Sequence, residues 1–158
     1  MKKLIFSIVC SIFLFSSCAS YQTISAPETI AKTIVVKSNH NSTFIKANEW
    51  MVQTFGNAES VIQFSDKEAG LVKGKYILFK GANATKYSAA QEDYYSMITL
   101  RVKDKGARIE VTPLADFKVL KMVGATSGFT PEMFTASAKV LIAEFEKHMN
   151  NKSANDSW

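Results

Sequence analysis

The thiol of Cys18 is the side chain whose type and position carry the clearest chemistry in this sequence. It follows an apolar run over residues 4–15, which is preceded by two lysines and followed by two serines. A positive start, a short apolar stretch and small residues before a cut are the pattern of an export signal. The run has twelve residues, whereas a transmembrane helix needs about 20 apolar residues. The pattern therefore predicts a signal peptide over residues 1–17 that ends directly before a thiol.

This segment resembles the signal of bacterial lipoproteins, with Phe-Ser-Ser-Cys at residues 15–18 in the place of the lipobox. Phe15 stands where the lipobox usually has Leu, Val or Ile, so a plain secretory signal cut elsewhere is the alternative. The resemblance implies export, cleavage before Cys18, and acyl chains such as palmitate on its sulfur. It implies a place in the cell envelope. Because no acidic cluster follows Cys18, we expect anchoring at the outer membrane, facing the periplasm.

Removal of the signal would leave 141 residues, which is enough for one domain with its own core. Cys10 would be discarded and Cys18 consumed by the lipid, so no disulfide is expected. Two lysines also leave, so 19 basic residues against 14 acidic become 17 against 14, and the net charge falls from +5 to +3. This dispersed excess does not indicate nucleic-acid binding. We expect a flexible tether over residues 18–29, one domain over residues 30–150 and a disordered tail over residues 151–158.

Hydrophobic periodicity predicts an α+β domain. Strands are expected over residues 30–36, 60–65, 71–79, 94–103 and 108–114, from β-branched residues and apolar–polar alternation. Apolar residues at spacings of three and four predict a helix that begins at Asn41 or Ser42 and is stopped by Gly56, and a last helix capped by Thr130. Residues 81–93 are expected to form a mobile loop, and residues 115–128 fit either a strand or a packed crossover.

The order β-α-β-β-β-β-α predicts an antiparallel sheet with two helices on one face and the other face open. The chain resembles, over residues 28–150, a domain family of unknown function with a TATA-binding-protein-like fold that is common among bacterial envelope and lipoprotein sequences. The resemblance rests on Ala-Asn-Glu-Trp at residues 47–50, Gly-Leu-Val-Lys-Gly at residues 70–74 and the turn at residues 102–108. It implies the fold and supplies no catalytic residue.

Other chemistry-bearing residues are too scattered to predict a catalytic or metal site. His40 and His148 have no partner in spacing, and a zinc site needs three or four Cys, His or carboxylate ligands. The segment at residues 70–75 has three residues between its glycines where a phosphate-binding loop needs four. No nucleophile elbow occurs. We therefore expect no cofactor, no metal and no enzymatic activity.

One group of side chains is a candidate binding face, provided that its members share the open face of the sheet. They would form a basic, partly aromatic platform for an anionic envelope component or a partner protein, or a solvated face kept soluble by charge. The group comprises Lys73, Lys75, Tyr95, Thr99, Arg101, Lys103 and Arg108. The leading hypothesis is a non-enzymatic, membrane-anchored accessory or binding protein. The second is a periplasmic carrier that holds a small ligand or lipid between the sheet and the last helix, and an enzyme is the third.

Overall fold

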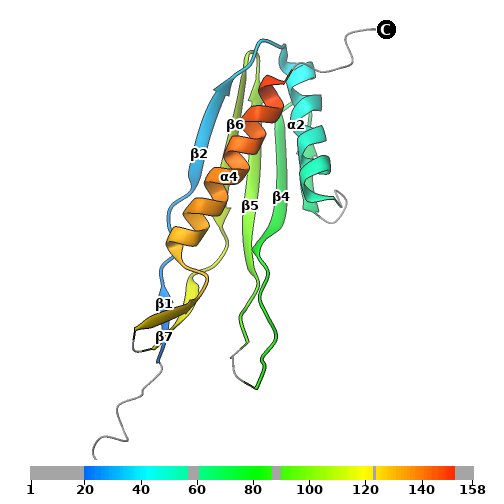
Figure 1. Cartoon of the computed structure of the whole chain (residues 1–158). Coiled ribbons are helices and arrows are strands. Elements are labelled where there is room, and N and C mark those ends of the chain that lie inside the picture. Colours follow the sequence, from blue (N-terminus) through cyan, green and yellow to red (C-terminus); the bar gives the residue numbers. More distant parts are fainter. Residues whose placement is uncertain (1–19, 57–60, 87–89, 123, 152–158) are drawn as a thin grey trace, which may run out of the picture.

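In its described residues the chain forms an α+β structure with two helices and antiparallel sheets (Figure 1). The computed structural model describes residues 20–56, 61–86, 90–122 and 124–151. The predicted signal peptide, Cys18 and the predicted tail beyond residue 151 lie outside the described residues. Among those described, no helix is both long and apolar enough to span a membrane.

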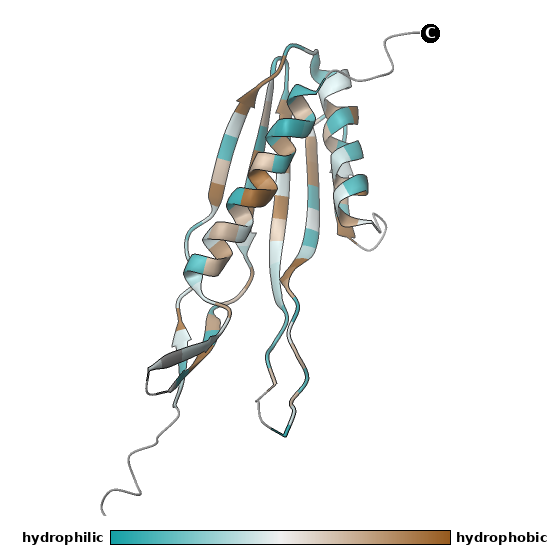
Figure 2. Ribbon diagram, in the orientation of Figure 1, coloured by the Kyte–Doolittle hydropathy of each residue, from teal (hydrophilic) through white to brown (hydrophobic). Residues whose placement is uncertain are grey.

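The larger sheet has five antiparallel strands. Its order is β2 (Ile30–Val35), β6 (Gly106–Pro113), β5 (Tyr94–Lys103), β4 (Leu71–Phe79) and β3 (Ile62–Asp66). Both helices, α2 (His40–Phe55) and α4 (Pro131–Asn150), pack on this sheet, and they cover the same face (Figure 1). The strands alternate in hydropathy along their length, as Figure 2 shows. The period-2 prediction of strands over residues 71–79 and 94–103 is confirmed in its bounds.

A second sheet has three strands, and its first strand lies within the segment predicted to be a tether. Its order is β1 (Ser20–Ile24), β7 (Phe117–Met122) and β8 (Ala125–Gly128). The prediction of a flexible tether is wrong for Ser20–Ile24, because this segment pairs with β7 in a register from Ser20 opposite Lys121 to Ile24 opposite Phe117. The segment at residues 115–128, for which two readings were open, forms β7 and β8. Pairing to a strand about 100 residues away leaves no local signal, which is why the tether was mispredicted.

An aromatic cluster joins the two sheets. The ring of Tyr94 lies 5.3 Å from Phe117 and 5.4 Å from Phe129, centroid to centroid. The Tyr94 hydroxyl accepts a hydrogen bond from Lys118 N at 2.7 Å and lies 3.2 Å from Lys118 O. Phe117 and Phe129 are both 2% exposed. The smaller sheet is therefore fixed to the end of β5 by buried rings and by hydrogen bonds to the backbone of β7.

The described residues of the segment between β4 and β5 form no helix or strand, as their composition predicts, and hydrogen bonds hold its two sides together. Gln91 N donates to Ala82 O at 2.8 Å, and Gly81 N donates to the Asp93 carboxylate at 2.8 Å. The segment between β4 and β5 also contacts the smaller sheet, because the Glu92 carboxylate binds Lys118 Nζ at 2.7 Å. This ion pair raises the pKa of Lys118. The described residues of this segment thus extend the β4–β5 hairpin toward β7 and β8.

The helices begin where side chains can accept their free amide hydrogens. Asn39 caps α2 by accepting from Ser42 N at 3.0 Å, so the prediction that Asn41 or Ser42 is the cap is wrong by two residues or more. Gly56 ends α2 with a φ of 65°, as predicted. Thr130 caps α4 and Pro131 follows it, which confirms the predicted start.

Replacing Thr130 by Ala is expected to cost about 1 kcal/mol of unfolding free energy through loss of the cap. The hydroxyl of Thr130 is also the main cause that lowers the pKa of Glu132, ahead of the backbone amide of Glu132 itself. A lowered carboxyl pKa stabilises the fold above the unfolded-state pKa, and this contribution is lost as the pH falls through the folded-state pKa. In Thr130→Ala the NMR titration of Glu132 should move up toward the ordinary value, whereas Thr130→Ser should retain both cap and titration. An unchanged titration in Thr130→Ala would contradict this account.

Candidate binding site on the open sheet face

The registers of β4, β5 and β6 bring all seven predicted platform residues to one face of the sheet. Ile98, Leu100 and Val102 of β5 are buried against the helices, so the alternate residues of β5 lie on the opposite face. Lys73 lies opposite Thr99, and Arg101 lies opposite Arg108. The seven residues therefore share the face that the helices leave uncovered, as the alternation predicts; that they bind a partner stays a prediction.

Within this face five of the seven platform residues fall into two groups, and Lys73 and Thr99, which lie opposite each other, stand between them. Lys75 Nζ lies 4.3 Å from the ring centroid of Tyr95, a cation–π contact near the start of β5. Arg101, Lys103 and Arg108 lie toward the other end of the strand. Between the two groups Thr99 is only 6% exposed, so its side chain presents little surface to a partner.

The second group surrounds a shallow hollow of about 220 Å³ at the end of the sheet where β2 and β5 finish. We call it the basic hollow, and it is lined by Thr33, Arg101, Val102, Lys103, Gly106, Ala107 and Arg108. Gly106 has no side chain to fill this space, and a Cβ there would come within 3.3 Å of Lys103 Cε. The ends of β2 and β5 and the start of β6, which contribute its lining residues, lie at the end of the molecule remote from β1 (Figure 1).

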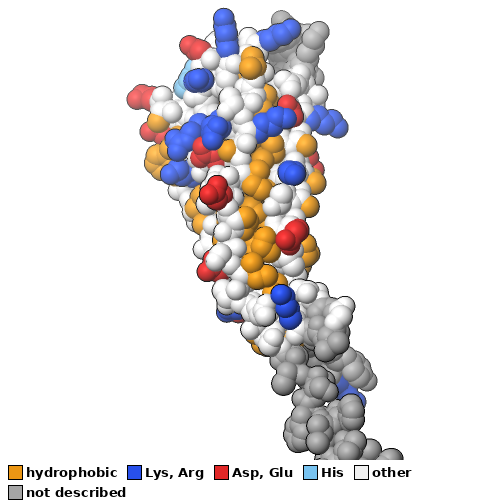
Figure 3. Space-filling view, turned by 90° about the vertical axis from the view of Figure 1, so that its left-hand side faces the viewer, with side chains coloured by type: hydrophobic (Ala, Val, Ile, Leu, Met, Phe, Trp, Pro, Cys, Tyr) orange, Lys and Arg blue, Asp and Glu red, His pale blue; other side chains and the backbone are white. Residues whose placement is uncertain are grey.

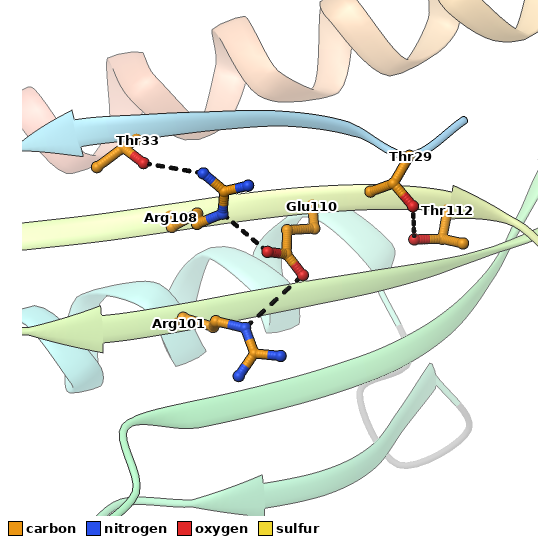
Figure 4. Close-up of polar contacts among 6 residues, drawn as sticks. All are labelled: Thr29, Thr33, Arg101, Arg108, Glu110 and Thr112. Atoms are coloured by element: carbon orange, nitrogen blue, oxygen red, sulfur yellow. Dashed lines mark hydrogen bonds and ion pairs between the residues drawn. The ribbon is translucent and has the colours of Figure 1, made fainter. Parts of the chain in front are cut away.

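Glu110 organises the two arginines of the hollow (Figure 4). Arg108 Nε donates to Glu110 Oε1 at 2.8 Å, and Arg101 Nε lies 3.7 Å from Glu110 Oε2. Like charges directly opposite each other on a sheet repel, and the shared carboxylate offsets that repulsion. Because Glu110 takes only the Nε donor of the five N–H donors of Arg108, some of the donors on its two Nη atoms stay available to an anion.

Arg108 also extends across the sheet toward β2. Its Nη1 donates to Thr33 Oγ1 at 3.3 Å, and Thr29 Oγ1 lies 2.8 Å from Thr112 Oγ1 further along the same strand pair. Figure 4 shows Thr33, Arg108, Glu110 and Arg101 as one row of polar contacts across three strands. Three cations and one carboxylate therefore meet at the hollow. Such an arrangement can hold a carboxylate or a phosphate group by charge-assisted hydrogen bonds.

The seven residues predicted from the sequence to form the binding face do not include Thr33 and Glu110. Glu110 could have been included, since it alternates with Arg108 on the same strand. Thr33 carries no such signal, because its place beside Arg108 depends on pairing between segments 75 residues apart. In the described part of the chain, no group of three or more His, Cys, Asp or Glu side chains is arranged to hold a metal ion.

The structure thus defines an α+β domain with a basic hollow on its uncovered sheet face. It is similar to a crystal structure of a DUF4468 family protein, a domain of unknown function, from Bacteroides ovatus ATCC 8483. The TM-score is 0.49 and the identity is 12%, over 82% of this chain and 92% of that one. No family model matches the chain, and no curated protein matches it either.

Proposed function

We propose that this chain is a lipid-anchored, non-enzymatic binding protein of the bacterial cell envelope that holds an anionic group of a partner in the basic hollow. The observation that carries the binding role is the convergence of Arg101, Lys103 and Arg108 on one open hollow beside a single carboxylate. The proposed anchor is the acylated sulfur of Cys18, at the outer membrane and facing the periplasm. Its support is the sequence pattern before Cys18.

The start of β1 at Ser20 bears on how such an anchor would work. Two peptide units separate Ser20 from Cys18, and they can span no more than about 7 Å. An acylated Cys18 would therefore hold the smaller sheet close to the bilayer. Thr33 of the hollow is thirteen positions beyond Ser20, at most about 45 Å of extended chain. Because the end of β2 lies remote from β1 (Figure 1), a partner could then be held away from the lipid surface.

The finer fold assignment is part of the same proposal. The larger sheet with its two helices follows the order β-α-β-β-β-β-α, which supports a TATA-binding-protein-like arrangement. The strands β1, β7 and β8 are additions to that order. A sheet covered by helices on one face only leaves a broad surface for a partner, which agrees with a binding role.

A surface site is favoured over an enclosed carrier cavity by the packing between the sheet and the helices. Trp50 of α2 and Phe145 of α4 are 2% and 0% exposed, and their ring centroids are 5.0 Å apart. The ring of Phe55 also packs against Trp50, with centroids 5.5 Å apart. Close-packed rings occupy the layer in which a carried ligand would have to lie. Native mass spectrometry that found a copurified lipid would favour the carrier instead.

The binding role is tested by replacing both arginines with glutamine in the full chain. With labelled poly-glutamate as probe, Arg101→Gln with Arg108→Gln should weaken binding roughly tenfold, because two charge-assisted contacts are lost. Lys139→Gln with Lys147→Gln makes the same charge change on exposed positions of α4, and it should leave binding within about twofold. Binding should also fall as salt rises. Equal loss in both pairs would reduce the effect to net charge and contradict the proposed site.

A further inference from the structure

The strand next to the basic hollow is a free sheet edge. Among the described residues, β2 is the outermost strand on its side of the larger sheet, and it pairs with β6 alone. Val36 N donates to Lys105 O at 3.1 Å, and Val36 and Lys105 continue the β2–β6 register. Because hydrogen-bonded positions alternate in an antiparallel ladder, Ile34 and Lys32 face β6 and residues 31, 33 and 35 direct their backbone groups outward.

This edge has little of the protection that edge strands normally carry. Charged side chains on an edge strand discourage the addition of another strand. The charge on β2 is Lys32, and its Nζ is bound to Glu146 of α4 at 2.6 Å, on the helix side of the sheet. On the open side β2 presents Ala31, Thr33 and Val35, and Val35 is 82% exposed. The backbone of β2 is therefore accessible to an extended segment.

The chemistry beside this edge indicates what kind of segment would fit. An added strand would lie about 4.8 Å from β2 and roughly 9.6 Å from β6. Arg108 already spans half of that distance, since its guanidinium reaches Thr33 on β2. A carboxylate side chain on the added strand, opposite Thr33, would approach the Arg108 guanidinium from the other side of Thr33. Figure 3 shows this side of the molecule, where Lys and Arg side chains, with Asp and Glu side chains among them, lie over the upper part beside a strip of hydrophobic ones.

We propose that an extended acidic segment of a partner protein adds to the free edge of β2, with its carboxylates on the open face reaching the basic hollow. Backbone hydrogen bonds to residues 31, 33 and 35 supply affinity, and Arg108 and Arg101 select for acidic side chains. The inference rests on the proposed function, because it specifies the partner of the same hollow. A second copy of this chain fits the edge less well, since two-fold pairing of β2 would bring two basic hollows together.

The test uses the full chain in detergent and a labelled ten-residue peptide that alternates Glu and Val. Methylating every second backbone nitrogen removes the hydrogen bonds of one edge of the peptide without changing its charge. Two such peptides exist, one methylated on the Glu nitrogens and one on the Val nitrogens. One of these two methylated isomers should bind at least tenfold more weakly than the parent peptide, and the other should bind within about threefold of it. Val35→Pro, which removes an outward N–H from β2, should weaken the parent peptide by a similar factor while circular dichroism stays unchanged.

The outcomes separate this inference from the proposed function. If both methylated isomers bind like the parent and Val35→Pro has no effect, strand addition is overturned; a tenfold loss in Arg101→Gln with Arg108→Gln would then still support an anionic partner. If the arginine pair has no effect either, both proposals are overturned. A dimer of the full chain that Val35→Pro dissociates would assign the edge to a second copy and overturn the partner proposed above.

Discussion

Replacing Cys18 by Ser is expected to abolish acylation of the chain almost completely, and with it the membrane binding that the acyl chains supply. A hydroxyl cannot form the thioether that carries the first acyl group, and the signal would no longer be cut before residue 18. Each buried CH₂ contributes about 0.8 kcal/mol to membrane binding, so one palmitoyl chain contributes on the order of 12 kcal/mol. Detergent phase partitioning and intact mass of the purified chain measure the two consequences.

Cys10 provides the matched control for this experiment. It lies inside the apolar run of the signal, so Cys10→Ser changes a thiol in the same way without touching the proposed attachment point. It should leave mass, cleavage and partitioning as in the parent chain. A Cys18→Ser chain with the parent's processing and detergent partitioning would contradict lipid anchoring, and a shift in both variants would point to a damaged export signal instead.

Replacing Gly70 by Ala is expected to give a large loss of stability from a single methyl group, because a left-handed backbone and a backbone clash coincide there. Gly70 lies in the turn before β4 with a φ of 62°, and its carbonyl accepts a hydrogen bond from Val102 N at 2.7 Å. A Cβ at this position would lie 2.3 Å from Val102 O and 2.7 Å from His40 Nε2. The His40 ring can rotate away, but the Val102 carbonyl belongs to β5, so the backbone has to separate.

The expected cost of Gly70→Ala is about 3 kcal/mol or more in unfolding free energy, from the left-handed backbone and the displaced strand together. Gly56→Ala is its control, because Gly56 has a φ of 65° and nothing lies within 4 Å of an added Cβ. It should cost about 1 kcal/mol. Urea denaturation of both variants gives the difference. Equal destabilisation would mean that the contact with β5 contributes nothing beyond backbone strain.

Gly70 also shows why the helix α2 and the β5–β6 turn are positioned together. Asp104 Oδ1 accepts a hydrogen bond from His40 N at 2.8 Å, and Lys105 N donates to Ser38 O at 3.3 Å. The turn between β5 and β6 thus holds the start of α2, while Gly70 packs under the same junction. Because the basic hollow is lined by residues on both sides of this turn, distortion at Gly70 is expected to disturb the site as well as the fold.

The local sequence determined those elements whose side chains repeat at the period of one helix or one strand. The apolar stripe of α4 with its Thr130 cap, and the alternation along β5, are set by residues within a few positions of each other. The shared face of Lys73, Thr99, Arg101 and Arg108 follows from the same period of two, because β4, β5 and β6 are consecutive hairpins. In these cases the sequence-based prediction and the structure agree.

Only the tertiary structure decided the pairings between distant segments. Ser20–Ile24 has little periodicity and became a strand through its pairing with β7, and Thr33 reached Arg108 through the pairing of β2 with β6. The free edge of β2 beside the hollow is equally a result of strand order. Local propensity acts over a few residues, whereas these contacts depend on which strands the buried aromatic cluster and the helices bring together. The shared face of the candidate residues could therefore be predicted from the sequence, whereas the hollow that three of them line could not.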